Sequence, residues 1–100
     1  MNNCELALSE GKVTVVVTGE VDLSWSSDIR ELILKALKME DSIQVDLEAV
    51  SYIDSSGIAG LVEGLQKAKK SGKSFELLNP SKSVLSVLQL ARLDQVFTIV

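Results

Sequence analysis

The chain contains no histidine and only one cysteine, Cys4, among its 100 residues. These absences exclude a Ser-His-Asp triad, a Cys-His pair and any metal site built on histidine. One cysteine cannot close an intrachain disulfide or form a Cys-x-x-Cys zinc site. Because cysteines without disulfide partners are typical of reducing compartments, we expect a cytoplasmic protein. We also expect it to hold neither a metal nor a cofactor.

Aromatic residues and positive charges are also scarce. Of the four aromatic side chains, none alternates with a basic cluster in the way that a base-stacking surface requires. Ten basic residues against 14 acidic ones give a net charge of −4, which opposes binding to nucleic acid or anionic lipid. No apolar stretch is long enough for a membrane span, and residues 1–5 lack the features of a signal peptide. We therefore expect neither direct nucleic-acid binding nor membrane insertion.

Apolar periodicity divides the chain into strands and helices. A strand at 5–8, a turn that contains Gly11 and a β-branched strand at 13–18 predict an N-terminal hairpin. An amphipathic helix follows at about 28–39, and its N-cap is either Asp28 or one of the serines just before it.

The second half of the chain continues the alternation. The next predicted elements are a strand at 43–47, a loop at 48–54, a helix ending at Gly72 and a strand at 74–78. A third helix follows, capped by Ser81, and a short strand lies within 94–100. The apolar face of the third helix carries Val84, Leu85, Leu88 and Ala91. A chain of 100 residues with 46% hydrophobic residues is long enough for one domain, 1–100. The order β-β-α-β-α-β-α-β predicts a single α/β domain with a mixed sheet and helices packed on it.

The segment Tyr52-Ile53-Asp54-Ser55-Ser56-Gly57 joins the predicted loop to the second helix. A helix N-terminus presents unpaired backbone N–H groups and a partial positive charge, so a phosphate carried on a serine is accommodated there. In the alternative interpretation, Asp54 or Ser55 is only the N-cap of the helix.

Three glycines, Gly57, Gly60 and Gly64, lie along this helix. Each costs about 1 kcal/mol relative to alanine in a helix interior. Gly60 and Gly64 share a face, so we expect a neighbour to approach that face closely. This neighbour is either another element of the same chain or a partner.

Two carboxylates, Glu20 and Asp22, follow the second predicted strand. Loops after the carboxyl ends of strands gather at one edge of an α/β sheet, so we expect Asp22 and Asp54 to share that edge. In the simpler interpretation, Glu20 and Asp22 are solvated and Asp22 helps to cap the first helix. Paired carboxylates also fit acid–base catalysis, but a chain of this size has little room for a sugar cleft, and we expect no enzyme. Trp25, at the start of the first helix, is either a lid on the core or an exposed contact.

Four segments together resemble a known family. Gly19-Glu20-Val21-Asp22, Val45-Asp46-Leu47, the stretch from Tyr52 to Gly57 and the stretch from Leu90 to Phe97 are similar to STAS domains of the bacterial anti-sigma factor antagonist type. The resemblance covers nearly the whole chain, in the element order predicted above. It implies a mixed sheet with helices packed on it, in which the loop before the second helix presents a phosphorylatable serine.

The resemblance implies partner switching. Ser55 matches the serine that is phosphorylated by an ATP-dependent kinase, which is also the anti-sigma factor, and Ser56 is a secondary acceptor. The unphosphorylated protein would bind the kinase and free the sigma factor, the phosphorylated protein would release the kinase, and a serine phosphatase would restore the first state. The implied partner-binding residues come from both loops and the start of the second helix: Glu20, Asp22, Asp54, Ser55, Ser56, Gly57 and Gly60.

The resemblance also leaves a second role open. Some STAS domains are small subunits of lipid-transport ABC systems and bind the ATPase of the transporter without being phosphorylated. Such members often lack the acceptor serine. The presence of Ser55 therefore favours the switching role.

Overall fold

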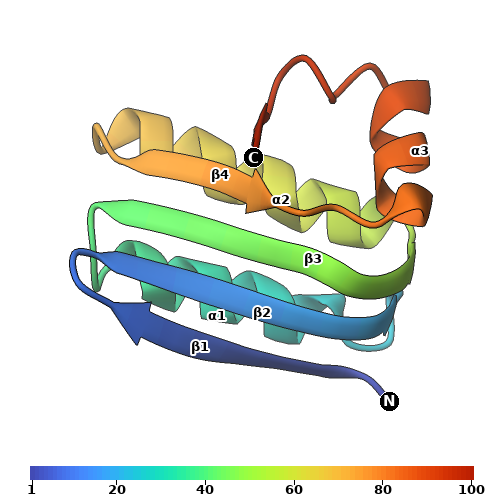
Figure 1. Cartoon of the computed structure of the whole chain (residues 1–100), viewed down its shortest axis with the longest axis horizontal. Helices are drawn as coiled ribbons and strands as arrows, with labels where there is room; N and C mark the ends of the chain where they lie inside the picture. The colour runs from blue at the N-terminus through green and yellow to red at the C-terminus, as the bar shows by residue number, and fades with distance from the viewer.

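A computed structural model describes all residues, 1–100, and shows one five-stranded sheet (Figure 1). The elements in chain order are β1 (Asn3–Ser9), β2 (Lys12–Val21), α1 (Ser26–Leu37), β3 (Ser42–Ile53), α2 (Ser55–Lys70), β4 (Ser74–Leu78), α3 (Lys82–Leu90) and β5 (Thr98–Ile99). The strands lie in the order β1-β2-β3-β4-β5; β1 is antiparallel to β2, and the other pairs are parallel. The predicted mixed α/β sheet and its element order are confirmed.

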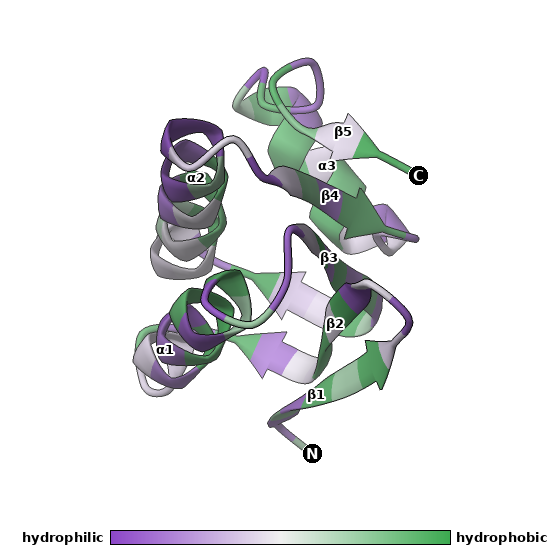
Figure 2. Ribbon diagram, turned by 90° about the vertical axis from the view of Figure 1, so that its left-hand side faces the viewer, coloured by the Kyte–Doolittle hydropathy of each residue, from purple (hydrophilic) through white to green (hydrophobic).

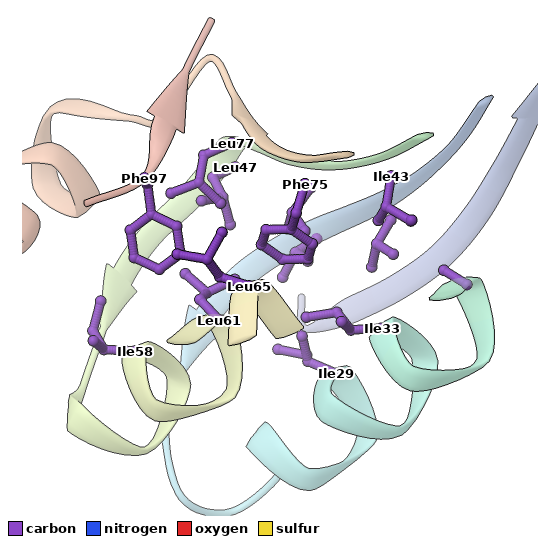
Figure 3. Close-up of a cluster of buried hydrophobic side chains, with 14 of the residues drawn as sticks. Ile29, Ile33, Ile43, Leu47, Ile58, Leu61, Leu65, Phe75, Leu77 and Phe97 are labelled. Carbon is purple, nitrogen blue, oxygen red and sulfur yellow. The ribbon is translucent and has the colours of Figure 1, made fainter. Parts of the chain in front are cut away.

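The core lies between the sheet and two helices, α1 and α2, which pack side by side on one face (Figure 2). Alternate residues of β2, among them Val13, Val15 and Val17, are buried on this face, as the period of two requires. Figure 3 shows Ile33 of α1 and Leu61 of α2 facing the sheet. Full burial of a side chain of this size stabilises the fold by about 1.5–3 kcal/mol.

β3 is longer than the sequence predicts. The expected strand at 43–47 extends to Ile53, so the predicted loop at 48–54 is wrong. Its second half pairs with the end of β2, which reaches Val21. The β2–β3 ladder contains two register shifts, and neighbouring residues such as Glu48 and Ala49 are both exposed. These shifts interrupt the alternation of apolar and polar residues from which the strand could have been recognised.

α1 begins earlier than predicted. Its N-cap is Trp25, which makes no side-chain capping hydrogen bond, and Asp28 lies within the first turn. The expectation of a cap by Asp28 or by a nearby serine is therefore wrong. The backbone carbonyl of Asp22 accepts the N–H groups of Trp25 and Ser26 at 3.2 and 2.9 Å, so the turn before the helix is closed by the backbone.

α3 lies beyond the carboxyl end of β4 (Figure 1). The predicted cap is confirmed, since the Ser81 hydroxyl accepts the N–H of Val84 at 3.2 Å and donates to the carbonyl of Val50 at 2.5 Å. The helix buries Val84 and Leu88, but Ala91, expected on the same face, is exposed because the helix ends at Leu90. No helix of the protein has both the length and the apolar character of a membrane span.

Candidate functional site

The carboxyl ends of β2 and β3 meet at one edge of the sheet, on the right in Figure 1. Asp22 follows β2 and Asp54 follows β3. The N–H of Asp54 donates to the carbonyl of Val21 at 3.0 Å, which joins the two chain segments directly. The structure therefore places the two aspartates at the shared edge that the sequence predicts.

Asp54 is the N-cap of α2. One oxygen of its carboxylate, Oδ1, accepts the backbone N–H groups of Ser56 and Gly57 at 2.9 and 3.2 Å. The same oxygen accepts the Ser56 hydroxyl at 2.5 Å. The hydroxyl bond is the main reason that the pKa of Asp54 lies below its ordinary value; the backbone N–H groups add to this effect and outweigh the opposing effect of desolvation. Asp54 is therefore a stable negative charge at the start of the helix.

The two serines that follow Asp54 are in different environments. Ser55 is the first residue of α2, is exposed and makes no side-chain hydrogen bond within the protein. Ser56 is half-buried, and its hydroxyl is engaged by Asp54. Of these two serines, only Ser55 therefore presents a free hydroxyl at this edge.

The β2–α1 loop forms the other half of the edge. The Asp22 carboxylate accepts the backbone N–H of Ser24 at 2.9 Å and its hydroxyl at 2.5 Å, which holds the loop in a turn. The indole N–H of Trp25 donates to the carbonyl of Glu20 at 2.7 Å. Trp25 is half-buried and packs against the core, so of the two interpretations the lid is the correct one. The Glu20 side chain is exposed at the end of β2.

Gly57 is a glycine because of the protein's own packing. A Cβ atom at this position would lie 2.6 Å from Cγ1 of Val21 and 2.7 Å from Cγ1 of Ile53. The residue is buried, so the space in front of its Cα is filled by the core and leaves no room for an approaching partner. The glycine lets the start of α2 lie close to the ends of β2 and β3.

The neighbour that approaches the Gly60 and Gly64 face is α1. At Gly64 a Cβ atom would lie 2.8 Å from Cγ2 of Ile33 and 2.9 Å from the ring of Phe75. At Gly60 the nearest atom is Cβ of Arg30, at 3.8 Å, which is an ordinary contact. Close packing within the same chain therefore explains why position 64 is a glycine. A contact between half-buried Gly60 and a partner remains a prediction.

Two exposed apolar residues beside this edge were missed by the sequence analysis. Leu23, in the β2–α1 loop, is 78% exposed, and Tyr52, near the end of β3, is 51% exposed. The backbone N–H of Leu23 also helps to lower the pKa of Asp54. An isolated apolar residue between Asp22 and Ser24 was the available signal for Leu23. Tyr52 belongs to the segment singled out from the sequence, but its exposed position on a strand could not be predicted because residues 48–54 were expected to form a loop. Both offer exposed apolar contact area at the carboxyl ends of β2 and β3.

Comparison with known proteins finds a family model and relatives that match nearly the whole chain. A family model described as "Mlab, STAS domain" matches residues 4–100. The chain is 26% identical over 97 residues to the anti-sigma-B factor antagonist of Bacillus subtilis, covering 97% of this chain and 89% of that protein. It is 29% identical over 96 residues to the intermembrane phospholipid transport system binding protein MlaB of Haemophilus influenzae, covering 90% of each.

Solved structures show the same fold. The anti-sigma factor antagonist SpoIIAA in its unphosphorylated form superposes with a TM-score of 0.82 at 25% identity, covering 98% of this chain and 88% of that one. The phosphorylated form of the Bacillus cell fate determinant SpoIIAA superposes with a TM-score of 0.76 at 24% identity, covering 98% and 91%. One fold therefore accommodates both states of that protein.

Proposed function

Because this chain belongs to the STAS domain family, we propose that it is a cytoplasmic anti-sigma factor antagonist that works by partner switching. Unphosphorylated, it binds an anti-sigma factor that is also a serine kinase, and thereby frees a sigma factor. Phosphorylation of Ser55 releases the kinase, and a serine phosphatase resets the cycle. The chain is the ligand and substrate in this cycle and catalyses none of its steps.

The observation that carries this proposal is the free, exposed hydroxyl of Ser55 at the first position of α2. Ser56, the secondary candidate, has its hydroxyl bound by Asp54 and would have to break that bond to react. Similarity to the anti-sigma-B factor antagonist supports the antagonist role.

The electrostatics of the edge explain how phosphorylation would release a partner. A phosphoserine adds about −1.5 to −2 charges at neutral pH. At Ser55 this charge lies next to the ionised Asp54 and on the edge that carries Asp22 and Glu20. A partner whose surface fits a neutral hydroxyl at Ser55 then meets repulsion and the cost of desolvating the phosphate.

The test is a pull-down from the cytosol of the source organism with wild-type, Ser55→Ala and Ser55→Asp baits, followed by mass spectrometry. We expect wild type and Ser55→Ala to retain a serine kinase, Ser55→Asp to lose it, and phosphate to be found on Ser55. Ser86→Asp is a matched control, because it adds the same charge at an exposed serine of α3. Equal retention of the kinase by all four baits would refute the proposal.

A second candidate function rests on the similarity to MlaB. In this case the chain would be a subunit that binds the ATPase of a membrane phospholipid transport system, and Ser55 would be only the first residue of a capped helix. The same pull-down separates the two functions. Retention of a transporter ATPase by wild type, Ser55→Ala and Ser55→Asp alike would establish the second.

A further inference from the structure

Positive charge is concentrated at the end of the molecule opposite to Ser55. This end consists of residues 9–12, 35–42 and 67–74, which form the β1–β2 turn and the ends of α1 and α2 with the loops that follow them; it is on the left in Figure 1 and faces the viewer in Figure 2. Seven of the ten basic residues lie there with three acidic ones, a net charge of +4, and the remaining three basic and eleven acidic residues give −8. The net charge of −4 therefore conceals a strongly dipolar molecule.

A groove at this end collects part of the positive charge. It lies between the last turns of α1 and α2, has a volume of about 550 Å³, and is lined by Leu34, Leu37, Lys38, Lys67, Lys70 and Lys73 among others. A second hollow continues along α2 past Lys69 and shares Lys67 and Lys70 with the first. The groove thus has two leucines in its wall and lysines around them, in a size range typical of ligand sites.

The fold itself uses only part of this charge. The two helix C-termini carry about −0.5 charges each, far less than the excess of lysines. The ammonium group of Lys73 donates to the carbonyl of Leu37 and so caps α1. Lys67 lies 3.7 Å from half-buried Glu63, a long pair, and Glu63 is bound more closely by Arg30 at 2.7 Å. Lys38 and Lys70 make no ion pair, so the groove retains uncompensated positive charge.

We propose that this groove binds an acidic segment of a partner protein, with leucine-like side chains against Leu34 and carboxylates facing Lys38, Lys67 and Lys70. The concave shape favours a narrow chain over a flat bilayer, which would reach the lysines on the rim but not the leucines. α2 has 16 residues, which corresponds to a length of about 24 Å, so the groove and Ser55 are separate surfaces at its two ends. The inference does not depend on phosphorylation of Ser55.

The test is an NMR titration of the full chain with a synthetic peptide in which two leucines are flanked by glutamates. We expect shifts of backbone amides within 34–38 and 67–73 and binding that weakens as salt is added. The double variant Lys67→Glu/Lys70→Glu should bind at least about tenfold more weakly, because two attractions become repulsions. The control Lys82→Glu/Arg92→Glu changes the net charge equally at exposed residues outside this end and should bind like wild type.

Three results would overturn the proposal. The first is equal weakening by the control variant, which would show that only net charge matters. The second is equal binding of a peptide with serines in place of leucines. The third is binding of wild type to phosphatidylglycerol vesicles while the peptide shifts no amide of the groove, which would make this end a membrane-facing surface. If the double variant does not fold, the single variant Lys70→Gln at an exposed position replaces it.

Discussion

Substitution of Gly64 by alanine tests the close packing of α2 against α1 and the sheet. The added methyl would lie 2.8 Å from Ile33 and 2.9 Å from Phe75. Ile33 is 1% exposed and Phe75 is 4% exposed, so neither can move without disturbing the core. Overpacking of this kind costs about 1–3 kcal/mol. Alanine in place of glycine in a helix returns about 1 kcal/mol, which leaves Gly64→Ala between neutral and about 2 kcal/mol less stable than wild type.

Gly60→Ala is the matched control on the same helix. Its methyl would meet only Cβ of Arg30, at 3.8 Å, so it should gain the helix propensity of about 1 kcal/mol without a clash. Because propensity cancels in the comparison, the difference between the two variants isolates the overpacking cost of about 1–3 kcal/mol. Urea unfolding followed by the fluorescence of Trp25 measures both. If Gly64→Ala proved as stable as Gly60→Ala, the inferred packing would be wrong.

Further predictions concern the titrating groups and the indole. The pKa of Asp54 is lowered from an ordinary value of 3.8. Its charge therefore stabilises the fold above that pH, and this stabilisation is lost as the pH falls through the lowered value. In urea unfolding at decreasing pH, Asp54→Asn should therefore lose less stability than wild type. Burial, and secondarily the charge of Asp28, raises the pKa of Cys4. Modification of the Cys4 thiol at neutral pH should therefore be slow and should accelerate in Asp28→Asn. An unchanged rate in Asp28→Asn would contradict the effect of the Asp28 charge. Trp25→Phe removes the hydrogen bond to the carbonyl of Glu20 and should cost about 1 kcal/mol in unfolding monitored by circular dichroism, whereas no loss would argue against that bond.

The elements that the sequence predicts well are those specified by residues close together in the chain. α2 has an aspartate cap, a regular apolar stripe and Gly72 just beyond its end, where φ is +67°. α3 likewise has Ser81 as its cap. Each of these signals acts within a few residues, so the sequence contains what is needed to recognise them.

The parts that could not be predicted depend on contacts between distant residues. The second half of β3 is a strand because it pairs with the end of β2, and the register shifts of that ladder leave no simple alternation. The start of α1 depends on a backbone turn at Asp22, with no capping side chain. At the site, the order of Asp54, Ser55 and Ser56 predicts a capped helix, but only the structure shows which serine hydroxyl is free.

The position of Asp54 also determines what a phosphate on Ser55 would do. A phosphoserine at a helix start normally gains stability from the unpaired N–H groups there. Here the Asp54 carboxylate already accepts the N–H groups of Ser56 and Gly57, so the phosphate would find these donors occupied and a negative charge beside it. Behind them Gly57 is packed against Val21 and leaves the helix little freedom to move. The proposed phosphorylation of Ser55 would therefore change the charge of the surface and leave the fold intact.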